Sequence, residues 1–208
     1  MIIGLVGFIG SGKNTVANYL VNAHNYKQDS FAHSLKDACS SIFNWPRHLL
    51  EGDTEESRVW RERVDEWWSN KLNIPNFTPR YALQYIGTNI LREKFNHDIW
   101  LLSLEHRLQH TDNIVISDTR FPNEIDLIRK NNGVILVVDN GARPEWYDYA
   151  FKAYKGDLNA LHTMKTTFKH VHESEWAWIG APYDGVIFNV GTLCDLKHNI
   201  ELSLQQIK

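Results

Sequence analysis

Residues 2–15 read IIGLVGFIGSGKNT, and this stretch decides the fold. The apolar run at 2–6 predicts a buried strand, and the glycine-rich stretch 7–15 follows it directly. Small residues let successive backbone N–H groups face one anion, and a helix that starts after the loop adds its partial positive charge. Lys13 supplies a full charge for terminal phosphates. The stretch therefore predicts a strand, a phosphate-binding loop (P-loop) and a helix, in that order.

The loop departs from the usual P-loop pattern at one position. A Ser or Thr ordinarily follows the lysine and offers its hydroxyl to Mg²⁺, whereas this chain has Asn14 and then Thr15. We therefore expect the metal to be held by phosphates, water and an acid elsewhere, and Thr15 to touch a phosphate oxygen. The residues expected to line the phosphate site are Ile9, Gly10, Ser11, Gly12, Lys13, Asn14 and Thr15.

The composition is that of a globular protein. Of 208 residues, 43% are hydrophobic and 23% charged, which favours one domain with sizeable insertions and excludes disorder. With 22 basic and 25 acidic residues the net charge is −3, which argues against nucleic-acid binding. Cys39 and Cys194 lie far apart, so neither a disulfide framework nor a cysteine zinc site is expected. No apolar run approaches the roughly 18 residues of a membrane span, and we expect a cytoplasmic protein without a membrane partner.

Short apolar runs alternate with helical segments along the whole chain. Continuous apolar runs with helical crossovers predict an α/β fold with a central, mostly parallel five-stranded sheet flanked by helices. The expected strands are 2–6, a weaker one at 27–31, 114–116, 134–138 and 185–188. The expected helices are 13–24, 34–43, 54–69 with Asp53 as N-cap and Glu56 in a capping box, and one that begins at Thr78-Pro79. The chain is thus expected to be one domain, 1–208, with helical insertions at about 45–77 and 140–181.

An acid and an arginine follow the strand at 114–116. Asp118 stands at the carboxyl end of that strand, where parallel sheets bind their ligands. We expect Asp118 to hold Mg²⁺, directly or through water, or to orient an acceptor phosphate, and Arg120 to neutralise phosphoryl charge. The alternative for Asp118 is a turn former or a helix cap. Asp139 also ends a strand and competes for the metal role, but it has no arginine next to it.

Polar side chains recur along the helix that follows Pro79. Arg80, Gln84 and Arg92 are spaced so that they can share one helix face. Bidentate guanidinium groups suit a monophosphate, and an amide can meet a base edge with both a donor and an acceptor. The alternative is an ordinary solvated face.

These features together resemble a known family. The chain is similar to the deoxynucleoside monophosphate kinases of tailed phages, least so at 45–77. The motifs that carry the resemblance are Gly12-Lys13-Asn14-Thr15, Phe31-Ala32 with Leu35-Lys36, Leu83-Gln84 with Gly87-Thr88 and Arg92, Trp100, Asp118 with Arg120-Phe121-Pro122-Asn123-Glu124, His172 with Ser174-Glu175, and Asn189 with Gly191-Thr192-Leu193.

The resemblance implies a P-loop kinase fold with an acceptor-binding insertion and a lid. It implies transfer of phosphate from ATP, with Mg²⁺, to a deoxynucleoside monophosphate. The loop and Lys13 would bind ATP, and Asp118 with Arg120 would lie between the substrates. Arg143 resembles a lid arginine that either stacks on adenine or covers the transferring group. The residues implied to bind the acceptor are Lys36, Arg80, Gln84 and Arg92.

Several questions stay open at the level of sequence. A P-loop ATPase or nucleotide switch shares the loop and Asp118, and a kinase of another small acceptor, such as a cofactor precursor, shares the fold. The base preference, the choice between deoxyribose and ribose, and a homodimer are undecided. If the chain is viral, we expect it in the host cytoplasm. His170 and His172 lack the spacing of a zinc protease helix, so we do not expect zinc there.

Overall fold

The structure is a computed structural model that describes residues 1–109 and 111–207. The chain divides into two compact units. One consists of Met1–Ser30 with Arg107–Lys208, and the other of Phe31–His106. The expected insertion at 140–181 therefore lies within the first unit, and the one at 45–77 lies within the second.

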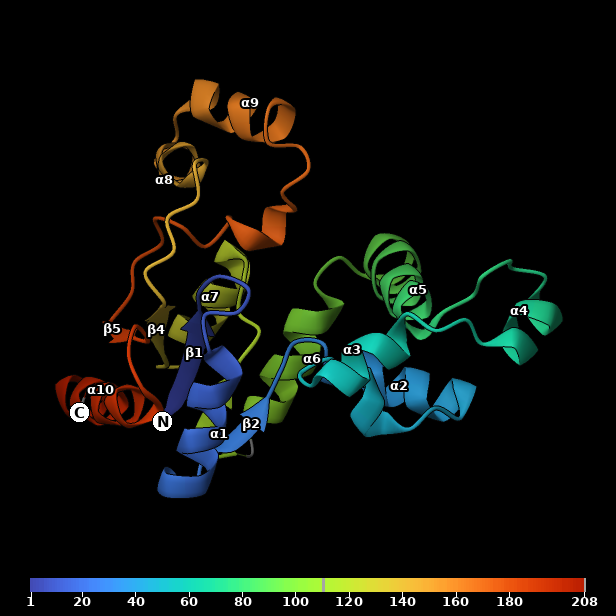
Figure 1. Cartoon of the computed structure of the whole chain (residues 1–208), viewed down its shortest axis with the longest axis horizontal. Helices are drawn as coiled ribbons and strands as arrows, with labels where there is room; N and C mark the ends of the chain where they lie inside the picture. The colour runs from blue at the N-terminus through green and yellow to red at the C-terminus, as the bar shows by residue number, and fades with distance from the viewer. Residues whose placement is uncertain (110, 208) are drawn as a thin grey trace. The chain divides into compact units, whose positions relative to one another are not determined.

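The first unit is built on a five-stranded sheet in which every neighbouring pair is parallel (Figure 1). The strand order is β2-β3-β1-β4-β5, so the strand that leads into the P-loop is central. In the register, Ile3 pairs with Val115 on one side and with Val134 on the other. The predicted parallel sheet is confirmed. The strands are β1 (Ile2–Val6), β2 (Lys27–Asp29), β3 (Ile114–Ile116), β4 (Val134–Asp139) and β5 (Gly185–Phe188).

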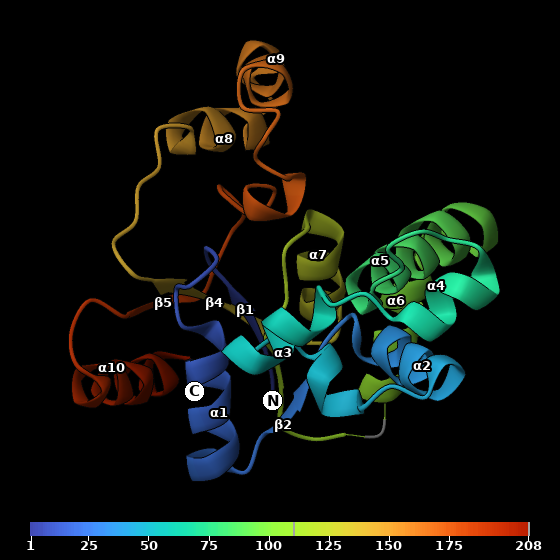
Figure 2. The ribbon, with the colours of Figure 1, turned by 45° about the vertical axis from the view of Figure 1, so that its right-hand side comes forward.

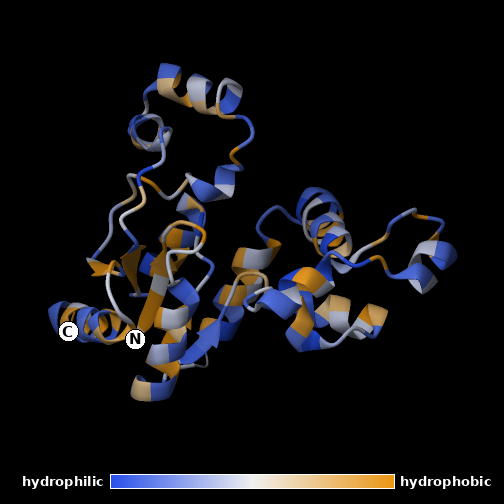
Figure 3. Cartoon of the chain, in the orientation of Figure 1, coloured by the Kyte–Doolittle hydropathy of each residue, from blue (hydrophilic) through white to orange (hydrophobic). Residues whose placement is uncertain are grey.

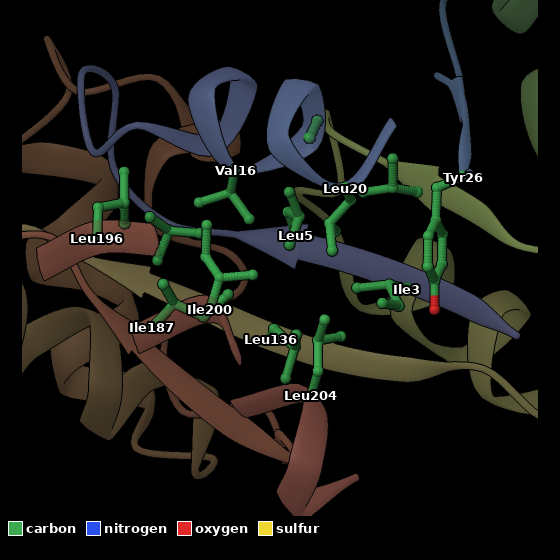
Figure 4. Packing of buried hydrophobic residues seen from close by; sticks show 13 residues of the cluster. Ile3, Leu5, Val16, Leu20, Tyr26, Leu136, Ile187, Leu196, Ile200 and Leu204 are labelled. Carbon is green, nitrogen blue, oxygen red and sulfur yellow. The ribbon is translucent and has the colours of Figure 1, made fainter. Parts of the chain in front are cut away.

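Helices cover both faces of the sheet, and the strands other than β2 are accordingly rich in apolar residues; Figure 3 shows the hydrophobic colour along β1 and the hydrophilic colour along β2. On one face, α1 (Lys13–His24) and α10 (Leu193–Gln206) pack Val16, Leu20 and Ile200 against strand residues such as Leu5 (Figure 4). The other face receives α7 (Pro122–Lys130). Gly4 is needed there, because a Cβ at this position would lie 2.6 Å from Ile128 Cδ1.

A long segment between β4 and β5 forms helices of its own, as predicted. Figure 2 shows this segment beyond the carboxyl ends of the strands, on the edge of the sheet that carries the P-loop. Within it α8 and α9 pack against each other. We call residues 140–181 the lid segment. Its helices are α8 (Tyr147–Tyr154), α9 (Leu158–Thr166) and the short 3-10 helix η3 (Glu173–Glu175).

The second unit is helical. Thr78 caps its helix by accepting from Tyr81 N at 3.1 Å and Pro79 is the first helical residue, which confirms the predicted start. The aromatic core of the unit includes Phe43 stacked on Trp45 with ring centroids 4.4 Å apart. The helices of this unit are α2 (His33–Phe43), the 3-10 helix η1 (Arg47–Leu50), α3 (Glu55–Arg61), α4 (Glu66–Leu72), α5 (Pro79–Gln84) and the π-helical η2 (Tyr85–Phe95); α6 (Ile99–Leu108) runs from it into the first unit.

The single helix expected at 54–69 is wrong. Two helices occupy this stretch, and each has its own N-cap. Thr54, not Asp53, caps the first one in a capping box with Ser57. Asp65 interrupts the stretch because its extended backbone cannot continue a helix, and its carboxylate accepts from Trp68 N at 3.0 Å and Trp45 Nε1 at 2.8 Å.

Across the described ranges 1–109 and 111–207, no helix is both long and apolar enough to cross a membrane.

Candidate active site

The P-loop connects β1 to α1, and its backbone adopts positive φ angles at its glycines. Gly10 has a φ of +75° and Gly12 a φ of +100°, both in the region that side chains disfavour. Ser11 is fully buried between them, and its N–H donates to Phe8 O at 3.1 Å. Ile9 is 72% exposed at the tip of the loop, and Asn14 and Thr15 are exposed in the first turn of the helix. The loop thus has the shape that the sequence predicts.

Lys13 folds back over this loop. Its Nζ donates to Gly7 O and to Phe8 O, each at 2.8 Å. Burial lowers the pKa of the Lys13 ammonium to about 8, and the positive charge of Arg120 acts in the same direction. The carboxylates of Glu175 and Asp118 oppose that shift. Four charged side chains therefore share the neighbourhood of the P-loop.

Asp118 and Arg120 follow β3 at the carboxyl edge of the sheet. Asp118 is half-buried and within electrostatic reach of Lys13. The Arg120 guanidinium donates through Nη1 to Ser174 Oγ at 3.0 Å and to Glu175 Oε1 at 2.9 Å. Both partners belong to η3 of the lid segment. The structure thus brings together Lys13, Asp118 and Arg120, and it ties the arginine to the lid segment.

Glu124 fixes the turn that carries Arg120. It is a carboxylate with only 4% of its surface exposed, at the start of α7. Its Oε2 accepts from Arg120 N at 2.7 Å and from Phe121 N at 3.1 Å. These N–H groups have no hydrogen-bond partner within the helix, and the buried carboxylate accepts from both of them. The partial positive charge at the start of the helix in turn stabilises the negative charge of the carboxylate. The sequence carries only half of a capping-box signal here, a glutamate three residues after the N-cap, because Phe121 has no side-chain acceptor.

Arg143 pairs with Asp139, the acid that competes with Asp118 for the metal role in the sequence analysis. It donates to both carboxylate oxygens of Asp139, Nη1 to Oδ1 at 3.1 Å and Nη2 to Oδ2 at 2.8 Å. This bond is the main cause that lowers the pKa of Asp139. Asp139 has no arginine next to it in the sequence, but Arg143, four residues on, pairs with it in the structure. The Arg143 guanidinium also lies 5.1 Å from the centre of the Tyr147 ring.

A cavity of about 450 Å³ adjoins this pair within the first unit. Its wall includes Phe8 from the P-loop, Arg143, and the aromatic side chains of Tyr147 and Trp178. Apolar walls with few polar groups are typical of sites for flat ligands.

Of the residues expected to bind the acceptor, Asp118 and Arg120 lie in the first unit, and the others lie in the second. The Lys36 side chain, 12% exposed on α2, pairs with Glu51 at 2.5 Å. On α5, Arg80 pairs with Glu62 at 3.1 Å and Gln84 is exposed. On η2, Arg92 has a buried Nε that meets no hydrogen-bond partner within the described residues. The helices α2 and α5 are in contact.

The sequence argument missed Arg61 in the same unit. Its Nε is also buried without a hydrogen-bond partner among the described residues. The guanidinium lies so close to Gly52 that a Cβ there would come within 1.9 Å of Arg61 Nη2. Burial lowers the pKa of Arg61, and the charge of nearby Arg80 adds to the effect. No sequence signal separates it from Arg58, because its burial depends on the turn at Gly52.

The chain is similar in sequence to two named viral proteins. No family model matches it. A protein of Acanthamoeba polyphaga mimivirus, named as a deoxynucleotide monophosphate kinase, is 34% identical over 153 residues, which cover 67% of this chain and 74% of that protein. The deoxynucleoside-5'-monophosphate kinase of Escherichia phage T5 is 28% identical, over 64% of this chain and 73% of that enzyme. The solved structure of shikimate kinase from Aquifex aeolicus matches with a TM-score of 0.44 and 16% identity, over 99% of this chain and 96% of that one.

The resemblance that the motifs indicated is confirmed by these relatives. The chain is an enzyme of the kinase class, and it belongs to the deoxynucleotide monophosphate kinase family.

Proposed function

We propose that this chain transfers the terminal phosphate of MgATP to a deoxynucleoside 5'-monophosphate and releases ADP and the deoxynucleoside diphosphate. The observation that carries the proposal is the group of Lys13, Asp118 and Arg120 around the P-loop at the carboxyl edge of the sheet. Membership of the family supports the choice of acceptor. An acceptor phosphate oxygen forms the new P–O bond, and the bond from the terminal phosphorus to the bridging oxygen of ADP breaks.

Catalysis in this scheme is positioning and charge neutralisation. The acceptor phosphate is already ionised near neutral pH, so no strong general base is needed. Lys13 and Arg120 supply the positive charge that the transferring group needs in the transition state. Arg120 has to exchange its bond with Glu175 for one with phosphate, and 38% of its side chain is exposed for that exchange.

The site fits Mg²⁺ as the partner of ATP. Asp118 is a half-buried carboxylate beside the P-loop lysine, and Thr15 offers an exposed hydroxyl on the first turn of α1. Mg²⁺ in nucleotide sites is bound through one or two carboxylates together with substrate phosphates and water. We assign Asp118 to the metal, directly or through water, and Thr15 to a phosphate oxygen. When bound, the ion would offset negative charge on the phosphates.

The second unit supplies the acceptor site in this proposal. Arg61 and Arg92 each have one buried guanidinium nitrogen, Nε, without a hydrogen-bond partner among the described residues, which costs free energy unless an acceptor binds there. The phosphate of the acceptor is such an anion, and arginine binds it in bidentate geometry. Lys36 and Arg80 add positive charge, and Gln84 is assigned to the base edge.

Arg143, in the lid segment, has two alternative roles: it contacts either the adenine of ATP or the phosphoryl group that is transferred. Its position at the wall of the cavity, over the Tyr147 ring, favours contact with a flat adenine over contact with the phosphoryl group.

We propose that the lid segment closes over the bound phosphates and excludes water, whose attack would hydrolyse ATP. Unchanged protease cleavage at 140–181, with and without a bisubstrate dinucleoside inhibitor, would contradict closure.

The acceptor requirement is tested with Arg92→Ala. In a kinase this variant should abolish transfer to the monophosphate, whereas in an ATPase or nucleotide switch it should leave ATP hydrolysis intact. A panel of small acceptors separates the deoxynucleotide from other substrates. Since both named relatives are viral, we place this activity in the supply of DNA precursors in the cytoplasm of an infected host.

A further inference from the structure

The P-loop is held in place by a residue from the opposite end of the chain. Asn189, which directly follows β5, is half-buried, and its Nδ2 donates to Ser11 O at 2.9 Å across 178 positions of sequence. Its backbone N–H donates to Asp139 O at 2.7 Å. One residue thus links the ends of β4 and β5 to the loop that follows β1.

The amide of Asn189 also fills the space next to the last glycine of the loop. A Cβ at Gly12 would lie 2.4 Å from Asn189 Nδ2, so only glycine leaves room for this contact. Because a trans peptide is planar, its C=O and N–H point in opposite directions. When Asn189 binds the carbonyl of Ser11, it therefore turns the N–H of Gly12 to the other side of the peptide, away from the amide.

We propose that Asn189 is a positioning residue for the nucleotide phosphates. It fixes the Ser11–Gly12 peptide so that the Gly12 N–H faces the anion before ATP arrives. This inference rests on the proposed use of ATP but not on the identity of the acceptor. Without the bond, the Ser11–Gly12 peptide loses the anchor of its carbonyl next to Gly12, whose φ is +100°, and part of the binding free energy is spent in ordering it.

A second asparagine provides a matched control. Asn199 on α10 also donates its Nδ2 to a backbone carbonyl, that of Phe188 at 2.8 Å. The bond has the same chemistry, but it ends on Phe188, the last residue of β5, and does not reach the P-loop. If Asn189 only stabilised the fold, alanine substitutions of Asn189 and Asn199 should have the same effect on nucleotide binding.

The experiment compares Asn189→Ala, Asn189→Asp and Asn199→Ala. Loss of one hydrogen bond predicts that Asn189→Ala raises the KM for MgATP about tenfold, with the KM for the acceptor unchanged. Asn189→Asp keeps the size but cannot donate, and its charge repels phosphate, so its KM for MgATP should rise further. Asn199→Ala should leave both constants unchanged. The Kd for ADP, measured by calorimetry without any acceptor, should be unchanged in Asn199→Ala, raised in Asn189→Ala and raised further in Asn189→Asp.

The ADP measurement separates this inference from the proposed function, since it needs no phosphoryl transfer. Equal Kd values for ADP in wild type, Asn189→Asp and Asn199→Ala would overturn the positioning role even if the chain proves to be a kinase.

A double-mutant cycle tests the contact itself. Gly12→Ala should weaken ADP binding less in the Asn189→Ala background than in wild type, because the 2.4 Å collision is then absent. Strictly additive effects would contradict the contact.

Discussion

The lowered pKa of Lys13 predicts how nucleotide binding depends on pH. Without nucleotide, burial sets this pKa at about 8, and bound phosphate raises it again because the charged form is then paired. A neutral lysine offers no charge to phosphate, so the affinity scales with the protonated fraction. With a pKa of about 8, roughly nine tenths of the lysine is charged at pH 7 and about one tenth at pH 9. The Kd for ADP should therefore rise about tenfold over that interval and stay nearly flat below pH 7.

Calorimetric titration with ADP between pH 6.5 and 9.5 measures this dependence. Lys13→Arg is the matched control, since a guanidinium stays charged throughout that range. The variant should bind ADP with a Kd that does not rise above pH 8. A flat profile in the wild type, or the same rise in Lys13→Arg, would refute the link between Lys13 and the phosphates.

Three further substitutions test other parts of the site. Asp118→Asn should lower kcat by orders of magnitude at saturating MgATP, and full activity would remove Asp118 from the metal site. Glu124→Ala should lower the free energy of unfolding by about 1–3 kcal/mol in urea, because two partly buried N–H groups lose the buried carboxylate that accepts from them; Asp126→Ala, at an exposed position on the same helix, should change it by less than about 0.5 kcal/mol. Arg61→Ala should raise the KM for the acceptor about tenfold or more without changing that for ATP, whereas Arg58→Ala, whose side chain is 54% exposed, should change neither; equal effects of the two arginine variants would exclude Arg61 from the acceptor site.

The fold could be predicted because its decisive signals are local. A buried parallel strand is a continuous apolar run, and each of the four expected apolar runs forms a strand, while the weaker candidate at 27–31 forms the short, polar strand β2. The helix α1 begins at Lys13 and ends at His24 as expected, because the loop glycines precede it and Asn25 adopts the left-handed conformation after it. The order of strand, glycine-rich loop and helix could be predicted from the same adjacency.

Residues that act through distant contacts could not be predicted. The break at Asp65 depends on Trp45, which donates to it across the helical unit. The partner of Ser11 is Asn189, near the other end of the sequence. Arg61 differs from its neighbours only through the turn at Gly52. In each case the contact that determines the position of the residue comes from another segment of the chain, and no sequence motif links the two segments.

The measurement that tests the central claim most directly is release of ADP from MgATP in a coupled assay. Each deoxy- and ribonucleoside monophosphate is supplied in turn, beside a control without acceptor. The account predicts turnover that depends on the acceptor and is supported by one or more deoxynucleoside monophosphates. Release of ADP at the same rate without any acceptor would contradict it and identify an ATPase instead.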